Sequence, residues 1–226
     1  LFVWHNDFRD SAKTREGGEE SLSGITHVVF DIGNVLVEWN PRHLYRKHFE
    51  REAEMEAFLS NVCTMDWHIA HDAGVSFEEN AEKLKARHPD HHELIDIWGA
   101  RYLEMSPGAV PGMEALVGTL KEKGLALHGL TNMPSSIYPK LHALYPAMQA
   151  LEVTVVSGEE KTLKPDPRLY EILIARAGLP VRATLYIDDS APNVRTAEKL
   201  GMYGHHFQNA DGLARELTQL GLLEAS

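Results

Sequence analysis

The sequence is poor in cysteine: among 226 residues only Cys63 carries a thiol. A single cysteine cannot form an internal disulfide, so we expect a reducing compartment and assign the protein to the cytoplasm. No apolar run approaches the ~18 residues of a membrane span, and no signal peptide is evident. We therefore expect a globular protein without a membrane partner.

Basic residues are scarce as well. Lys and Arg number 22 against 33 Asp and Glu, which gives a formal net charge of −11. Binding to nucleic acid without sequence preference relies on clustered Lys and Arg, so this balance argues against a nucleic-acid partner. The 13 histidines are scattered, and neither His91-His92 nor His205-His206 has the spacing of a metal site. Nothing in the sequence indicates an oligomeric state.

Three patterns divide the chain. Residues 1–24 contain few large apolar side chains, and we expect a flexible leader without a catalytic role. Residues 25–40 and 106–226 alternate short apolar runs with helical patterns, whereas 41–105 show helical patterns only. Alternating strands and helices are typical of a doubly wound, Rossmann-like α/β fold with a parallel sheet. We predict such a core, interrupted after its first strand by an α-helical cap over residues 41–105.

The predicted elements follow from apolar runs and from turn and cap residues. Strands are expected over 25–31, 125–131, 151–156, 183–187 and 202–207. Within 41–105, helix starts are expected at Pro41, at a capping box beginning with Ser76, and at Asp90. Further helices are expected over 111–123, 134–144, 165–177 and 191–200, with one more at the C-terminal end.

Polar side chains follow the ends of four predicted strands. In chain order they are Asp31, then Thr131 and Asn132, then Lys161 and Lys164, then Asp188 and Asp189. The carboxyl ends of parallel strands meet at one edge of a sheet, so these groups should converge on one crevice. Carboxylates are the oxygen ligands that Mg²⁺ prefers, and a lysine can neutralise charge on a transferred group. The set predicts binding and attack at a phosphoryl group.

The order of these motifs resembles that of a known superfamily. The motifs are Phe30-Asp31-Ile32-Gly33-Asn34-Val35-Leu36, Leu130-Thr131-Asn132, Lys164-Pro165-Asp166-Pro167 and Ile187-Asp188-Asp189-Ser190-Ala191-Pro192-Asn193. Over about residues 25–207 they resemble the four motifs of the haloacid dehalogenase-like (HAD) hydrolases. The predicted insertion resembles the small α-helical (C1) cap of that superfamily.

The resemblance implies roles in phosphoryl transfer. Asp31 would be the nucleophile that takes the phosphoryl group as an aspartyl-phosphate. Thr131 and Asn132 would bind the phosphoryl oxygens. Lys164, whose Lys-Pro-Asp-Pro context matches the motif better than that of Lys161, would neutralise both the nucleophile and the transferred group.

The resemblance also implies a Mg²⁺ site. Asp31 and Asp189 would ligate the ion through their side chains, and Gly33 would do so through its backbone carbonyl. Asp188 and Asn193 would support the metal. Mg²⁺ is thus the expected cofactor.

One position departs from the pattern. Phosphatases of this superfamily usually carry a second aspartate two residues after the nucleophile, where it serves as general acid and base, but this chain has Gly33 there. Acid–base catalysis contributes about 10²–10⁴-fold to such reactions, so its loss should matter. Four residues of the predicted cap could supply the proton: Asp66, His68, His71 and Asp72. Four nearby aromatic residues could line the pocket: Trp39, His43, Trp67 and His68.

Three functions are compatible with this pattern. The first is a Mg²⁺-dependent phosphatase acting on a small phosphorylated metabolite, for example a sugar phosphate. The second is a metal-independent 2-haloacid dehalogenase, in which Asp31 would attack carbon and expel halide without needing an acid. The retained pair Asp188-Asp189 favours the first function. The third is a non-catalytic module that binds a phosphorylated ligand, against which the intact set of nucleophile, lysine and acids argues.

The substitution Gly33→Asp tests the significance of the missing acid. If leaving-group protonation limits the reaction, the new carboxyl should raise turnover on esters of poor leaving groups more than on activated esters. Comparing initial rates of the wild type and the variant on an alkyl and an aryl phosphate measures this difference. Equal effects on both esters would mean that the missing acid does not limit the enzyme.

Overall fold

The computed structural model describes residues 24–224, so the predicted leader lies, apart from Gly24, outside the described residues. The predicted α/β fold is confirmed. Five parallel strands form one sheet in the order β3-β2-β1-β4-β5. They are β1 (His27–Phe30), β2 (Ala126–Thr131), β3 (Val153–Val156), β4 (Thr184–Asp188) and β5 (Tyr203–His206). The strand order reverses at β1, where open α/β sheets bind ligands.

The register brings the ends of the three central strands level with one another. Phe30, the last residue of β1, pairs with Gly129 of β2 and with Ile187 of β4. The chain continues in register for one more residue, because the Asp31 N–H donates to the Ile187 carbonyl at 2.8 Å. Residues immediately after these strands therefore share one edge of the sheet.

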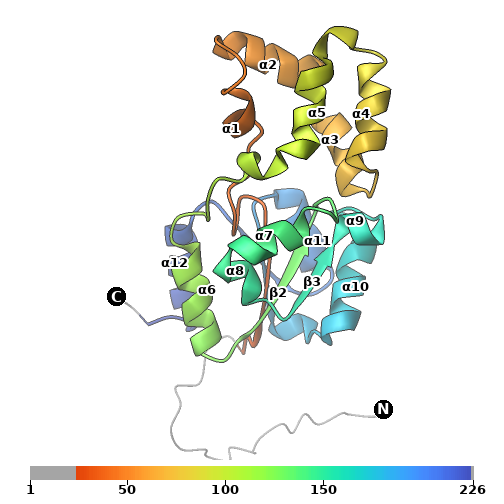
Figure 1. Ribbon diagram of the computed structural model, residues 1–226. Helices are drawn as coiled ribbons and strands as arrows, with labels where there is room; N and C mark the ends of the chain where they lie inside the picture. The colour runs from red at the N-terminus through yellow and green to blue at the C-terminus, as the bar shows by residue number, and fades with distance from the viewer. Residues whose placement is uncertain (1–23, 225–226) are drawn as a thin grey trace, which may run out of the picture.

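Helices cover both faces of the sheet (Figure 1). On one face, Val28 and Phe30 share an apolar cluster with residues of α6 (Met113–Glu122), α7 (Tyr138–Leu144), α8 (Pro146–Gln149) and α12 (Ala210–Gln219). On the other face, Val29 belongs to a second cluster with residues of α10 (Pro167–Ala177) and α11 (Ala191–Lys199). Alternate residues of β1 thus face opposite layers, which explains its continuous apolar sequence.

Residues 42–105 form a separate group of helices, which we call the helical unit (Figure 1). Its helices are α1 (Arg42–Tyr45), α2 (Glu52–Asn61), α3 (Met65–Asp72), α4 (Phe77–Lys85) and α5 (His92–Ala100). Two 3₁₀ turns, Pro89–His91 and Tyr102–Met105, flank α5. Aromatic rings fill the interior of the unit, where Trp98 is fully buried against Tyr45 and Trp67. Across residues 24–224 no helix has the length and hydropathy that crossing a membrane requires.

Some predicted helix starts are confirmed and others are wrong. Ser76 caps α4 as expected, because its Oγ accepts the Glu79 N–H at 3.1 Å. Asp90 does not cap α5; it lies within a 3₁₀ turn that begins at Pro89, and α5 starts at His92. The helix expected over 134–144 begins only at Tyr138. The preceding residues form a turn next to the start of α9 (Ser157–Glu160), since the Met133 N–H donates to Ser157 Oγ.

Gly158 and Gly118 offer a matched pair of glycine substitutions. Gly158 lies in α9 (Ser157–Glu160), where an added Cβ would come within 2.6 Å of the Ser135 nitrogen and 2.8 Å of the Met133 oxygen. Gly118 lies inside α6, where an added Cβ would meet nothing within 4 Å. We expect Gly158→Ala to cost about 1–3 kcal/mol of unfolding free energy through overpacking. Gly118→Ala should add about 0.5–1 kcal/mol through helix propensity. Urea unfolding measures both, and equal shifts would contradict the packing at α9.

Candidate active site

The acids that follow the central strands converge in space. Asp31 follows β1, Asp188 is the last residue of β4, and Asp189 comes next. One carboxylate oxygen from each of the three lies within 4.8 Å of the other two. Asp31 and Asp188 are buried, whereas Asp189 is exposed. The group is therefore open to the surface on the Asp189 side.

Lys164 joins two of these acids from the loop after β3. Its Nζ lies 2.8 Å from Asp31 Oδ1 and 2.8 Å from Asp188 Oδ2, and it donates to the Leu130 carbonyl at 2.9 Å. Burial alone would lower the pKa of Lys164, but the two adjacent carboxylates raise it above its usual value. Each of the three ammonium hydrogens has an acceptor, so the Lys164 ammonium group is held in one position. Lys161 is exposed and takes no part in this network.

Asn132 holds the backbone of Lys164. Its Oδ1 accepts the Lys164 N–H at 2.8 Å, and its Nδ2 donates to the Lys164 carbonyl at 3.1 Å. Both polar atoms of the amide are thus used to attach the lysine loop to the end of β2. The Asn132 side chain positions Lys164.

Asp188 is held by several donors. The Tyr186 hydroxyl donates to Oδ2 at 2.7 Å, while Asn193 Nδ2 and the Ser190 N–H each donate to Oδ1 at 2.9 Å. Burial alone would raise the pKa of Asp188, but Lys164 and these donors keep it below its usual value. Asp188 is therefore ionised and fixed in orientation. Tyr186 was not predicted as a site residue because, inside an apolar strand, it is indistinguishable from a core residue.

The surroundings of Asp31 shift its pKa in the opposite direction, above its usual value. Burial, together with the neighbouring Asp188 and Asp189, raises its pKa to about 7 against the effect of Lys164. Partial desolvation of the carboxyl group and the neighbouring Asp188 also raise the pKa of Asp189, although the residue as a whole is exposed. Three carboxylates share one ammonium, which leaves negative charge uncompensated. Clustered carboxylate oxygens with excess negative charge fit a hard divalent cation such as Mg²⁺.

Thr131 ends β2 beside this cluster. Its side chain is buried, yet among the described residues its Oγ1 has no hydrogen-bond partner. An unpaired buried hydroxyl is unfavourable unless a ligand pairs with it. This hydroxyl therefore fits a contact to a bound oxygen atom.

A cavity of about 160 Å³ opens above the acids, between the strand ends and the helical unit. Of the four predicted pocket residues, Trp39 and His68 line it and are stacked with ring centroids 4.9 Å apart. His43 does not line it. Trp67 is buried inside the helical unit, where its Nε1–H donates to the Asn80 carbonyl.

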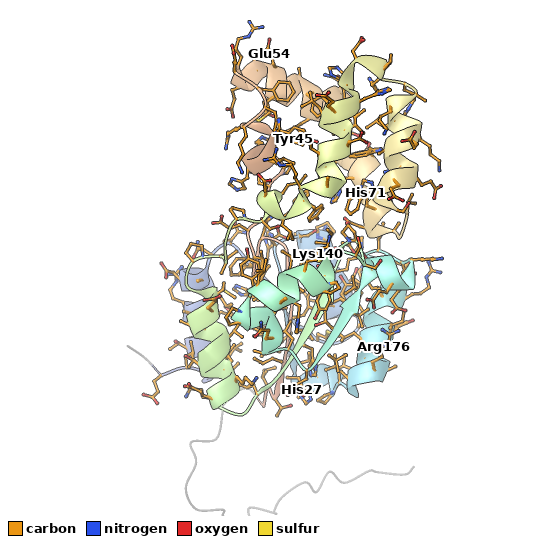
Figure 2. The ribbon with its side chains drawn as sticks, in the orientation of Figure 1. His27, Tyr45, Glu54, His71, Lys140 and Arg176 are labelled. Atoms are coloured by element: carbon orange, nitrogen blue, oxygen red, sulfur yellow. The ribbon has the colours of Figure 1, made fainter. Side chains whose placement is uncertain are left out.

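Of the four candidate proton donors, two line the cavity and two do not. His68 and Asp72 line the cavity, whereas Asp66 lines a different surface depression, together with residues of α2. The His71 Nε2 lies 3.0 Å from Asn80 Nδ2 inside the helical unit. Figure 2 shows His71 on α3 above Lys140 on α7; both helices contribute residues to the cavity wall. Gly33 also lines the cavity, and an added Cβ there would meet nothing within 4 Å.

Comparison with known proteins identifies the class. The model of the haloacid dehalogenase-like hydrolase family matches residues 25–201, and the chain belongs to that family. It is therefore an enzyme of the hydrolase class.

Three similar proteins extend the comparison. The chain is 25% identical over 202 residues to sesquiterpene phosphatase astK of Aspergillus oryzae, covering 85% of this chain and 94% of that one. A predicted HAD-like hydrolase of Porphyromonas gingivalis superposes with a TM-score of 0.69 at 20% identity, over 89% of this chain and all of that one. A HAD family enzyme of Bacteroides thetaiotaomicron, solved with magnesium and inorganic phosphate, superposes with a TM-score of 0.61 at 19% identity, over 82% and 96% of the two chains.

Thr131→Val tests whether the unpaired hydroxyl is a ligand contact. The valine side chain has nearly the same shape, and no hydrogen bond to the described residues is lost. We expect the unfolding free energy to stay equal or to rise by about 1 kcal/mol, because a buried unsatisfied group is removed. Inhibition by inorganic phosphate should weaken at the same time. A loss of stability of the same size would indicate instead a structural partner for the hydroxyl.

Proposed function

We propose that this hydrolase is a Mg²⁺-dependent phosphatase that acts through an aspartyl-phosphate on Asp31. The observation that carries the proposal is the buried Lys164 ammonium between Asp31 and Asp188, with Asp189 completing three clustered carboxylates. A relative named as a phosphatase and a structural neighbour solved with magnesium and phosphate support it.

The residues at the strand ends have complementary parts in this reaction. The Asp31 carboxylate attacks phosphorus, and Lys164 orients it at 2.8 Å and favours its ionised form against the effect of burial. The Thr131 hydroxyl donates a hydrogen bond to an oxygen of the transferred group. Asn132 holds the lysine loop, and Asn193 holds Asp188.

The carboxylates of Asp31 and Asp189 and the Gly33 carbonyl would hold Mg²⁺, with Asp188 in support. The negative charge left uncompensated by Lys164 is the reason that these residues fit the ion. When bound, Mg²⁺ supplies charge neutralisation on the phosphoryl oxygens, which reduces their repulsion by the Asp31 carboxylate.

The cavity wall indicates the kind of substrate. Among the residues that line it there is no Lys or Arg, whereas Trp39, Met65, Tyr102, Met133 and Leu141 contribute apolar surface. A second anionic group on the substrate would therefore find no cationic partner there. We propose a substrate with one phosphate and an uncharged leaving group; a sugar monophosphate and a phosphate ester of an apolar alcohol both qualify.

The two other functions have less support. A 2-haloacid dehalogenase displaces halide from carbon and has no use for three clustered carboxylates. A module that only binds a phosphorylated ligand has no use for a nucleophile oriented by a buried lysine.

A panel of phosphate esters and 2-haloacids, assayed with Mg²⁺ and with EDTA, tests the function. We expect phosphate release that EDTA abolishes and that favours monophosphates over bisphosphates and phosphorylated carboxylic acids. Asp31→Asn should reduce turnover at least about 10³-fold, the scale expected for loss of a nucleophile.

Two results would contradict this proposal. Halide release that survives EDTA, with no phosphate released from any ester, would favour the dehalogenase. Binding of phosphorylated compounds without any turnover would favour the non-catalytic module.

A further inference from the structure

We propose that Asp72, from the helical unit, donates the proton to the leaving oxygen and so replaces the acid that Gly33 cannot provide. The inference rests on the proposed phosphatase reaction and concerns only how the leaving alcohol is protonated.

The first observation is an unpaired carboxyl oxygen in the cavity. Asp72 is the last residue of α3, is 7% exposed and lines the same cavity as Asp31 and Gly33. Its Oδ1 is buried and, within residues 24–224, has no hydrogen-bond partner. A buried polar atom without a partner is costly, and a bound substrate would remove that cost by hydrogen bonding.

The second observation is that the core holds Asp72 in place. The Ser157 hydroxyl, at the end of β3, donates to the Asp72 carbonyl at 2.6 Å. The same Oγ accepts the Met133 N–H at 3.0 Å, which connects this end of α3 to the segment after β2. Two residues later, Gly74 adopts a φ of +95°, and a Cβ there would lie 2.9 Å from the Gly158 carbonyl. The C-terminal end of α3 is thus docked against the strand ends, with its carboxyl in the cavity.

The third observation is the open space at Gly33. Apart from Gly33 itself and its two chain neighbours, no atom of residues 24–224 lies within 4 Å of the position that a Cβ would occupy there, so the place of the usual acid is open to the cavity. A substrate oxygen above Asp31 is therefore accessible from the Asp72 side of the cavity.

Asp72 is better suited than the other candidates. Asp66 and His71 do not line the cavity. His68 does, but burial and His71 lower its pKa to about 3, so it is neutral and has no excess proton to give.

Burial raises the pKa of Asp72 to about 7, against the effect of Lys164, so a protonated carboxyl is available near neutral pH. Its other ionisable neighbours are His68, whose Nε2 lies 3.6 Å from Oδ1, and Tyr102. Neither carries a charge at neutral pH.

The proton balance closes over two half-reactions. In the first, an Asp31 oxygen bonds to phosphorus, the bond from phosphorus to the leaving oxygen breaks, and that oxygen takes the Asp72 proton. In the second, the Asp72 carboxylate takes a proton from water as the water oxygen bonds to phosphorus. The bond from phosphorus to Asp31 then breaks, inorganic phosphate leaves, and Asp72 is protonated again.

The test compares Asp72→Asn with the wild type on two esters, by kcat/KM, which reports the step in which the leaving group departs. An alkyl phosphate has a strongly basic leaving oxygen that needs a proton, whereas p-nitrophenyl phosphate does not. We expect a loss of about 10²-fold or more on the alkyl ester and of only a few fold on the aryl ester. Asp72→Glu should recover part of the alkyl activity.

Two further variants serve as controls. Asp66→Asn removes an acid of the same helix outside the cavity and should leave both rates unchanged. In a Gly33→Asp background, where the core supplies an acid, Asp72→Asn should cost less than about tenfold on the alkyl ester.

The outcomes separate the two proposals. Aryl-ester hydrolysis that needs Asp31 supports the phosphatase whatever Asp72 does. Equal losses on both esters, or none on either, in the Asp72→Asn enzyme would overturn the role of Asp72. A wild type that releases phosphate from neither ester would overturn the proposed function and this inference together.

Discussion

The rest of the site depends on the buried ammonium of Lys164. Two carboxylates beside each other in a protein interior would repel and take up protons, and removing one partner of a buried ion pair typically costs about 3–5 kcal/mol. Here Lys164 lies 2.8 Å from both Asp31 and Asp188, and donors from β4 and α11 satisfy the remaining oxygens of Asp188. The network therefore keeps Asp188 ionised, while Asp31 stays close to the protonation balance that a cation would shift.

The sheet topology explains why these groups can meet. β1 is central, with β2 on one side and β4 on the other, so Asp31 emerges between Thr131 and Asp188. Lys164 comes from the crossover after β3, two strands away, and reaches the centre because Asn132 holds its backbone. A parallel sheet places all of these residues at one edge, which is why polar groups distant in sequence form one cluster.

The meeting of parallel strand ends at one edge of the sheet also explains which features could be predicted from sequence. Strand ends are visible as apolar runs followed by acids or turn residues, so Asp31, Thr131 and Asp188 could be placed together without coordinates. No comparable rule predicts which residues of the helical unit face the cavity. Trp67 and His68 are adjacent in sequence, yet one packs inside the unit and the other faces the cavity. That choice depends on how α3 packs against Trp98 and Trp39, which local periodicity does not encode.

The errors at helix starts have a similar origin. Asp90 is a good cap residue, but Pro89 begins a 3₁₀ turn that places it one position too early. Residues 134–137 have a helical pattern, but the hydrogen bond from the preceding Met133 to Ser157 attaches this segment to the start of α9. In both places a local or tertiary contact outweighs the intrinsic helix propensity of the residues, which is worth only a few tenths of a kcal/mol per residue.

The core and the helical unit contribute different groups to the proposed reaction. With glycine at position 33, the core in the proposed reaction would supply a nucleophile and charge neutralisation but no proton, so by itself it would suit activated leaving groups only. Asp72 lies in the cavity wall because Ser157 attaches the end of α3 to the core. In the proposed reaction, protonation of the leaving oxygen therefore depends on the contact between Ser157 and the end of α3. Under that proposal, an ester that displaces the end of α3 would lose the acid, so the helical unit would select the substrate through the chemical step and not by affinity alone.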